Sequence, residues 1–543
     1  MKAATTAIGA QTQWDYLPLN SGKAATDFYD VDNTELNSTA GYFHFSANIN
    51  VVSQVRYSDG VGGFRAFNYK YRDATLNSTG RGFQGFDQII VDDVANSLRS
   101  ASNYHIKFPL TGSLAEVRKC VSEAGNPTCS TLPIETTKYT YDLWRDGLVK
   151  QTIPDTTIDF SIHVLEGTGT DNRYWVSPGL TETKAFETSS SQTAAAGALQ
   201  PITVGLNWIH RIQLESAFDP NGCIISSVER YEEPGGANRN EVTTNISYLT
   251  ADLATWWLCR TDDETVSTAP VAGRAIEYAS VEVGSDTQTQ VKTTYDWDIT
   301  HRKPSSVTIE TPAGGGKPTR TTTVYNPYGL PSSVKVEGTS YNGVAFAMPD
   351  RDTTMTYSSD EYFVTSVTNG LGHITSTSTD ARYESAVQVT DPNGQITSLT
   401  YDVFGRLKSS KAPGEPTVRV AYWWCSGLHG GTAWCPQGDH ARTRKLTRAA
   451  GAPDILEYFD YLNRKVYELT RNFENNQYYR TRRRFDARGL LSFTQNRHAN
   501  DDSSTIRTTY LDGYDNLGRL TKQRAPQSND TYLQTNYAYI DHT

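Results

Sequence analysis

Residues 368–407 read TNGLGHITSTSTDARYESAVQVTDPNGQITSLTYDVFGRL. This stretch contains four Asn or Asp residues at equal intervals of 11, and each opens a cluster of turn-forming residues: Asn369, Asp380, Asp391 and Asp402. A fixed interval of this kind is the signature of a repeat architecture.

The segments between these clusters alternate in polarity, as residues 386–390 and 397–401 show, which is typical of a strand with one face turned inward. Each repeat is therefore predicted to be one strand and one turn. The Asp side chain accepts a hydrogen bond from the backbone N–H two residues on. A Gly three residues after the Asp takes the positive φ that a Cβ would penalise.

The pattern recurs upstream of this stretch and downstream as far as Leu520, at wider intervals of 26 to 30 residues, as if a hairpin separated the recognisable turns. In one turn Asn463 stands in the glycine position, which Asn tolerates better than other residues. The predicted turn residues are Tyr325, Asn326, Gly329, Asn369, Gly372, Asp380, Asp391, Gly394, Tyr401, Asp402, Gly405, Arg406, Phe459, Asp460, Phe485, Asp486, Gly489, Tyr514, Asp515, Gly518 and Arg519.

The pattern aromatic-Asp-x-x-Gly-Arg-Leu at residues 401–407 and 514–520 resembles the YD repeat of the RHS proteins, and residues 295–543 carry it. Residues 80–86 (GRGFQGF), followed by an apolar run, resemble a segment before the repeats in the B component of insecticidal toxin complexes. The resemblance implies a β-strand ribbon that spirals into a hollow shell around a cytotoxic cargo.

We therefore predict an all-β fold in which YD/RHS strand-turn repeats form a curved, shell-like sheet, a partial cocoon. The expected regions are a β-rich pre-repeat region at 1–115, an irregular β-rich region at 116–290 and the repeat region at 291–543. The interval from Asp402 to Asp460 is 58 residues, which indicates an insertion at about 412–450.

Composition narrows the function classes. Only 37% of the residues are hydrophobic while Tyr supplies 32 residues, which suits thin sheets better than deep helical cores. A net charge of -10 argues against a nucleic-acid binder. The densest basic cluster favours a solvated strand over a phosphate or acidic-partner site: Arg480, Arg482, Arg483 and Arg484.

No catalytic residue and no cofactor are predicted. The chain has no Gly-x-Ser-x-Gly string, and residues 314–317 (GGGK) precede Pro318 rather than the Ser or Thr of a phosphate loop, so they are predicted to be a hairpin connection. The glycines of residues 80–86 precede no helix that could bind a nucleotide. Relatives self-cleave at a C-terminal aspartyl site, and nothing here matches that site.

Targeting signals are also missing from the sequence. No apolar run approaches 18 residues, and the first 20 residues lack a basic region followed by an apolar core. We expect no membrane span, and the resemblance implies secretion or a cell-surface location. The toxin relatives also have a propeller that this chain lacks, and residues 536–543 look like the start of another turn. A partial reading frame is therefore expected.

Six cysteines include two close pairs, Cys120 with Cys129 and Cys425 with Cys435. Disulfide clips and buried thiols are both open for these pairs, and a disulfide or a proximal thiol pair is favoured for Cys425 and Cys435. Cys425, His429, Cys435 and His440 also supply the ligand types of a zinc site, but their spacing is not that of structural zinc motifs, so zinc is the weaker alternative.

We accordingly predict a structural role: a fragment of an RHS shell that encloses or presents a polypeptide cargo. The expected partners are that cargo or a companion toxin-complex subunit. Two alternatives stay open at this point. One is a carbohydrate-binding or adhesion protein, because sugars stack on exposed aromatic rings. The other is a metal-dependent enzyme built on the insertion at 412–450.

Overall fold

The structure is a computed structural model that describes residues 2–6, 9–21, 28–31, 41–123, 125–145, 149–153, 174–190, 199–234, 238–270, 289–310, 319–338, 340–341, 344–345, 351–425, 433–472, 476–499, 508–528 and 531–539. These residues form β-strands and two 3-10 turns, η1 (Leu19–Ser21) and η3 (Gln437–Asp439), and none of them lies in an α-helix. The all-β prediction is confirmed. Within the described ranges no helix is long and apolar enough to cross a membrane.

The chain divides into two compact units. Unit 1 comprises Met1–Ile212, Ala421–Thr447 and Pro453–Thr543, and unit 2 comprises Gln213–Val420 and Arg448–Ala452. Three strands cross the division: β14 (Ile202–Phe218), β30 (Val418–Trp424) and, at its last residue, β31 (Thr443–Arg448). The three regions expected from the sequence follow composition and repeats rather than packing, and that division remains a prediction.

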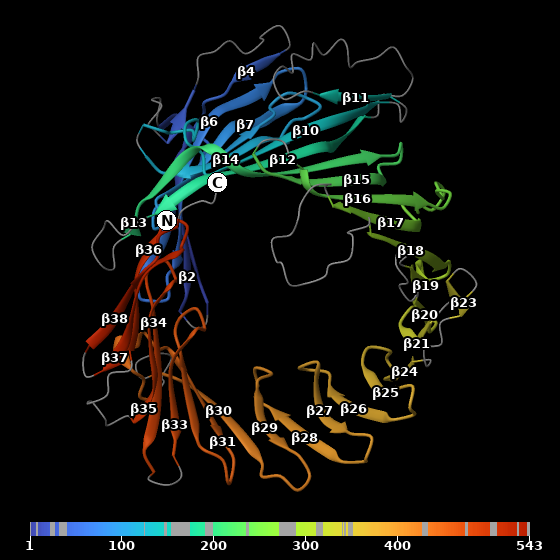
Figure 1. Ribbon diagram of the computed structural model, residues 1–543, viewed down its shortest axis with the longest axis vertical. Helices are drawn as coiled ribbons and strands as arrows, with labels where there is room; N and C mark the ends of the chain where they lie inside the picture. The colour runs from blue at the N-terminus through green and yellow to red at the C-terminus, as the bar shows by residue number, and fades with distance from the viewer. Residues whose placement is uncertain are drawn as a thin grey trace. The chain divides into compact units, whose positions relative to one another are not determined.

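Unit 1 combines strands from both ends of the chain. Most of them pair antiparallel with a neighbour in sequence, and β13 pairs in parallel with β36, which joins the N-terminal and C-terminal segments of this unit (Figure 1). Its strands are β1 (Lys2–Thr5), β2 (Gln11–Pro18), β3 (Tyr29–Asp30), β4 (Tyr42–His44), β5 (Asn50–Ser58), β6 (Phe64–Asn77), β7 (Gly82–Asp93), β8 (Leu98–Tyr104), β9 (Leu114–Val121), β10 (Glu135–Arg145), β11 (Val149–Ile153), β12 (Tyr174–Ser190), β13 (Leu199–Gln200), β31 (Thr443–Arg448), β32 (Ile455–Phe459), β33 (Lys465–Arg471), β34 (Tyr478–Phe485), β35 (Leu491–Ala499), β36 (Thr508–Asp515), β37 (Leu520–Ser528) and β38 (Thr531–Asn536).

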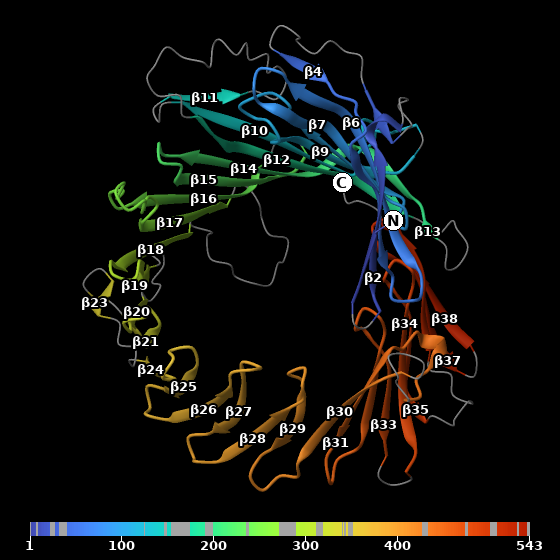
Figure 2. The same ribbon diagram turned by 180° about the vertical axis from the view of Figure 1, so that it is seen from behind.

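Unit 2 is a succession of antiparallel hairpins in which each strand pairs with the next in the chain (Figure 2). A separate small hairpin of β22 (Ser340–Tyr341) and β23 (Val344–Ala345) interrupts the succession. The other strands are β15 (Ile224–Glu232), β16 (Asn238–Tyr248), β17 (Thr261–Pro270), β18 (Thr289–Asp298), β19 (Lys303–Glu310), β20 (Thr319–Tyr325), β21 (Pro331–Gly338), β24 (Arg351–Tyr357), β25 (Val364–Thr368), β26 (Ile374–Asp380), β27 (Ser385–Thr390), β28 (Ile396–Tyr401) and β29 (Leu407–Lys411).

The two units differ in how much they bury. Unit 1 has three hydrophobic clusters, centred on Tyr458, Tyr29 and Ile90. Among the described residues of unit 2, the buried hydrophobic side chains are Cys223 and Val420 alone. Unit 2 is therefore held together by strand ladders and by its turns, because it has little apolar core to stabilise it.

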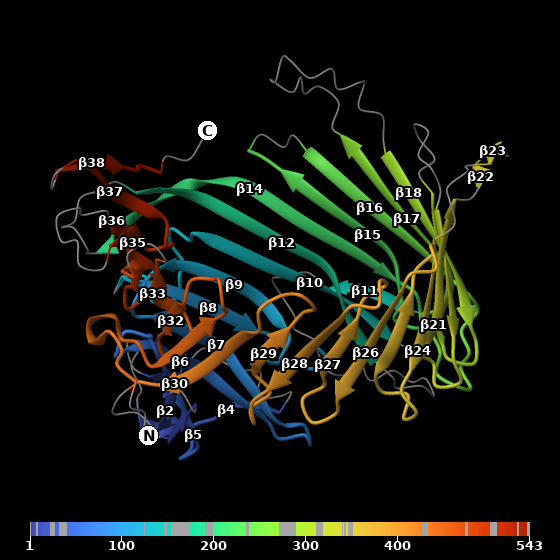
Figure 3. The ribbon, with the colours of Figure 1, turned by 90° about the horizontal axis from the view of Figure 1, so that it is seen from below.

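Turns alternate between the two edges of such a sheet, so turns 11 residues apart lie on opposite edges (Figure 3). Asp380 and Asp402 close hairpins on one edge, whereas Asn369 and Asp391 close hairpins on the other. The wider intervals seen elsewhere separate turns on the same edge, which agrees with the hairpin expected between them. We call the edge that carries the turns of Asn326, Asp380 and Asp402 the motif edge of unit 2.

Candidate functional site

The repeat turn is the unit from which the candidate site is built. At Asp402, one carboxylate oxygen, Oδ1, accepts hydrogen bonds from the backbone N–H of Phe404 at 2.9 Å and of Arg406 at 3.0 Å. The backbone closes the same turn twice, from Asp402 N to Arg406 O and from Gly405 N to Asp402 O. The same set of bonds occurs at Asp219, Asn326, Asn369, Asp391, Asp460, Asp486 and Asp515.

The glycine positions adopt the expected backbone conformation. Gly405 has φ 73°, Gly518 has φ 79°, and Asn463 has φ 58° in the turn where it replaces Gly. The turn after Asp380 differs, because Glu384 rather than the fourth residue takes the positive φ. The repeat there is one residue longer between the Asp and its left-handed residue.

Sequence reasoning missed two turns of this kind. Residues 218–222 (FDPNG) form a turn with all the hydrogen bonds of the Asp402 turn. Residues 219–222 have the same sequence, DPNG, as the predicted turn at residues 391–394, so the sequence contained the signal for this turn. Asp59 binds the backbone N–H of Val61 at 2.8 Å and of Gly63 at 2.9 Å in the same way. Residues 249–259 form an irregular turn with an isolated bridge between Asp252 and Trp257.

The aromatic residue before the Asp joins one turn to the previous hairpin. The hydroxyl of Tyr401 donates to the carbonyl of Ala386 at 2.8 Å, and that of Tyr325 donates to the carbonyl of Pro304 at 2.7 Å. In each case the accepting residue lies next to a β-bulge, where the ladder is interrupted and a carbonyl needs another partner. The same bond is made by Tyr357, Tyr514 and Tyr539.

Neighbouring turns on the motif edge of unit 2 also contact each other. Lys303 donates to the carbonyl of Gly329 at 2.6 Å, and the side-chain amide of Asn326 donates to Glu361 at 2.7 Å. A disulfide between Cys223 and Cys259 joins the first two turns of this edge. Side chains and one covalent bond thus link the turns of the edge in sequence.

In unit 1 the corresponding turns are docked against turns from the N-terminal half of the chain. Arg464 Nη2 donates to the backbone carbonyl of Asp59 at 3.1 Å. The amide of Asn516 donates to the carbonyl of Asn96 at 2.7 Å and accepts from the N–H of Ile202 at 3.0 Å. We call these contacts, together with those of Asp515 described next, the unit 1 seam.

Asp515 is the most enclosed residue of the seam, with a fully buried side chain. Its second oxygen, Oδ2, accepts from Arg519 Nε at 2.6 Å and from the hydroxyl of Ser190 at 3.2 Å. Burying a carboxylate is tolerated when hydrogen bonds and a cation satisfy it, as they do here. The turn cap is therefore also a connection between distant parts of the chain.

Several groups of the turns have shifted pKa values. Burial alone would raise the pKa of Asp402, but the Arg406 side chain and the two backbone N–H groups lower it below the usual value. The hydrogen bond from Arg382 lowers the pKa of Asp380. Burial raises the pKa of Tyr514 to about 12.

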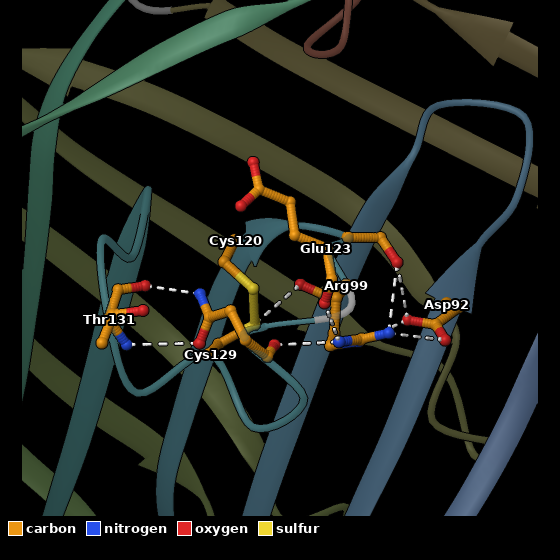
Figure 4. Close-up of a disulfide and its surroundings, with 8 residues drawn as sticks. Asp92, Arg99, Cys120, Glu123, Cys129 and Thr131 are labelled. Atoms are coloured by element: carbon orange, nitrogen blue, oxygen red, sulfur yellow. Dashed lines mark hydrogen bonds and ion pairs between the residues drawn. A yellow bond between two sulfur atoms is a disulfide. The ribbon is translucent and has the colours of Figure 1, made fainter. Parts of the chain in front are cut away.

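The six cysteines form three disulfides: Cys120–Cys129, Cys223–Cys259 and Cys425–Cys435. Two of them join the predicted pairs, and the third was not predicted because its partners are 36 residues apart. Next to the first, Arg99 Nη1 donates to the carbonyls of Glu123 and Asn126, and Arg99 Nε donates to Asp92 at 2.6 Å (Figure 4). The disulfide loop is thus also held by a buried arginine.

The described part of the insertion contacts strand β34. Asp439, whose side chain is 1% exposed, accepts from Arg482 Nε at 2.6 Å and from Arg484 Nε at 2.8 Å. The alternating Arg residues of this strand thus pair in part with a carboxylate of the insertion, a role that the solvated-strand interpretation did not include.

The zinc alternative is wrong for this structure, because the thiolates it needs are joined in the Cys425–Cys435 disulfide. His440 is exposed, and His429 lies outside the described residues. No group of metal-ligating side chains occurs in the part of the chain that the structure describes.

Two glycine-rich segments were also considered in the sequence. The hairpin expected at residues 314–317 lies outside the described residues. The three glycines of residues 80–86 all have positive φ.

The family described as RHS Repeat matches residues 386–415, which contain the turns of Asp391 and Asp402. The chain contains RHS repeats. No curated protein matches the sequence.

Several solved structures share the fold of this chain. The crystal structure of TcdB2-TccC3 has 12% identity and a TM-score of 0.60, and the match covers 97% of this chain and 34% of that one. The complex TcdB2-TccC3-Cdc42 matches with 12% identity and a TM-score of 0.59, covering 95% of this chain and 35% of that one. The Photorhabdus luminescens Tc holotoxin pore matches with 11% identity and a TM-score of 0.56, over 90% of this chain and 33% of that one.

This chain therefore spans about a third of the length of these toxin-complex chains. At such low identity the likeness shows the fold alone, and it agrees with the predicted fold class.

Proposed function

We propose that this chain is a structural wall segment of an RHS-type toxin-complex shell and that it encloses or presents a polypeptide cargo. The observation that carries the proposal is the series of RHS repeat turns, which are linked to one another in unit 2 and docked into the seam in unit 1. Such links stiffen a thin sheet that has little core of its own, which is what a wall requires.

The bonding of the turn carboxylates supports a role without catalysis. Asp402 and Asp515 each use one oxygen for two backbone N–H groups and the other oxygen for the arginine four residues further on. A carboxylate occupied in this way is a poor general base, because its proton-accepting lone pairs are already committed.

The three disulfides support a secreted or cell-surface location. All six cysteines are paired, and such bonds form and persist in oxidising compartments rather than in the cytosol. The companion subunits of this proposal would be other chains of a toxin complex. Carbohydrate binding, the adhesion alternative, remains a prediction that a glycan array with the purified chain would test.

Protease protection tests the enclosure of cargo. An unfolded, protease-sensitive peptide fused after Thr543 is expected to be cleaved at least about tenfold more slowly than the same peptide added free. The seam variant Asp515→Ala should remove the protection, whereas the matched turn variant Asp402→Ala should retain it. Equal cleavage of the fused and free peptides would contradict enclosure by this chain.

A further inference from the structure

The turns in the unit 1 seam show which groups the side chains of an RHS turn can bind. Their side chains donate to backbone carbonyls of other hairpin turns: Arg464 to Asp59 and Asn516 to Asn96. A turn suits this role because its carbonyls are not used in a strand ladder. The ligand of a motif turn in this protein is thus a second row of hairpin turns.

The turns of the unit 1 seam and the turns of the motif edge differ in the exposure of the side chain at the same motif position. Two residues after the Asp or Asn, Leu462 is 44% exposed and Leu517 39% exposed in the seam. On the motif edge of unit 2, Tyr328 is 71% exposed and Phe404 78%. The carboxylates differ in the same direction, from 0% at Asp515 to 22% at Asp402.

Exposed aromatic side chains occur in four turns of the motif edge. Trp256 and Tyr362, in two further turns of this edge, are 79% and 66% exposed. Turns on one edge of an antiparallel sheet repeat every second strand, so the tips are spaced by about 10 Å. Exposed aromatic side chains in series mark an interaction surface, since a lone one needs no explanation.

Charge on this edge is of both signs. Arg382 has a side chain that is 75% exposed, and the exposed Glu384 lies in the same turn. Two identical edges placed antiparallel therefore bring opposite charges together, and their equal spacing brings the turn tips into register. This complementarity favours a second copy of the same chain over a partner of uniform charge.

We propose that the motif edge of unit 2 is a self-association interface, on which the turn row of a second copy of this chain docks as the N-terminal turns dock in the unit 1 seam. The aromatic tips supply the apolar contact, and turn side chains donate to backbone carbonyls of the partner's turns. The proposal does not depend on what the shell contains.

Sedimentation velocity of the full chain tests the interface. Wild-type protein is expected to self-associate with increasing concentration, and the double variant Phe404→Asp/Tyr328→Asp should weaken the association at least about tenfold. The control is Leu371→Asp, because Leu371 is 81% exposed but lies on the opposite edge of the same sheet. It should associate like the wild type. Circular dichroism and melting of each variant establish that the fold is kept.

A cross-linking experiment provides an independent readout. All six cysteines are bonded, so a single introduced cysteine is the sole free thiol. Tyr362→Cys is expected to form a disulfide-linked dimer on mild oxidation, and Leu371→Cys is expected to stay monomeric. The proposal is overturned if the wild type remains a monomer at every concentration, or if the two edges respond equally in either experiment.

Discussion

The turns at Asp402 and Asp515 follow the same sequence pattern and make the same backbone hydrogen bonds, yet they serve different purposes. The Asp402 side chain is 22% exposed and pairs with its own Arg406. The Asp515 side chain is fully buried and also holds Ser190, which lies 325 residues away in the chain. In unit 2 the motif only closes a hairpin. In unit 1 the same motif closes a hairpin and also joins two segments that are distant in the chain.

The turn motif therefore has two separate roles: its backbone hydrogen bonds close the hairpin locally, and its side chains can also bind a distant segment. Its backbone part needs only the Asp, the left-handed fourth residue and the N–H groups between them. Its side-chain part becomes a long-range connection only where another row of turns lies within reach.

Removal of the two carboxylates gives the sharpest contrast. Asp515→Ala should destabilise the seam by about 3–5 kcal/mol, because it leaves Arg519 and several N–H groups of the seam without their partner. Asp402→Ala should cost about 1 kcal/mol, as expected for loss of an exposed cap. Hydrogen exchange of β36 and β37, compared with β28 and β29, measures both effects. Similar losses at the two sites would show that burial does not distinguish the turns.

The Cys223–Cys259 disulfide tests whether the two units are stabilised separately. It closes a loop of 36 residues, and its removal in Cys223→Ser/Cys259→Ser should cost about 4 kcal/mol by the chain-entropy expression. Hydrogen exchange should accelerate in β15 and β16 but stay unchanged in β33 and β34. Acceleration in all four strands would mean that the units unfold together.

Two glycines of unit 2 separate backbone strain from crowding. Gly394 and Gly405 both have positive φ, but a Cβ at Gly405 would lie 3.2 Å from Tyr383 Cδ1, whereas one at Gly394 meets nothing within 4 Å. Gly394→Ala should cost about 1 kcal/mol from strain, and Gly405→Ala about 2 kcal/mol. Urea unfolding of the two variants gives the difference. A larger loss at Gly394 would refute the assignment of crowding to Gly405.

The hydrogen bond from the Tyr514 hydroxyl to the carbonyl of Leu491 has a small expected effect on stability at neutral pH and a larger one at alkaline pH. Because the folded-state pKa of about 12 lies above the ordinary value near 10, the stabilisation is complete below pH 10 and is lost as the pH rises through 12. Tyr514→Phe should remove this alkaline dependence and cost about 1 kcal/mol at neutral pH, the net contribution of one hydrogen bond. Spectrophotometric titration of the wild type and the variant measures the shift, and an unshifted tyrosine titration would contradict the burial of this hydroxyl.

At the acidic end the sign is reversed. The pKa values of Asp380 and Asp402 are lowered in the folded chain, so their stabilisation is present above the ordinary pKa of Asp and is lost as the pH falls through the lower folded-state value. Asp402→Asn should flatten this acid dependence of unit 2, as measured by hydrogen exchange or unfolding across the acidic range. An unchanged acid profile would show that the turn carboxylates do not govern it.

The sequence by itself determined the local structure of this protein. Alternating residues predicted strands, the Asp and Gly spacing predicted the turns and the positive φ of Gly405 and Gly518, and closeness in the chain indicated two disulfide pairs. These features depend on hydrogen bonds and bonds between residues close in sequence, so the pattern of residues contains the information needed to predict them.

Long-range packing fixed the other features: which turns share an edge, the Cys223–Cys259 pairing, the tyrosine hydroxyl bonds to the previous hairpin and the burial of Asp515 beside Ser190. Each joins residues that are 15 or more positions apart. The shared turn pattern cannot reveal such contacts, because it does not specify the neighbour that folding places against each turn.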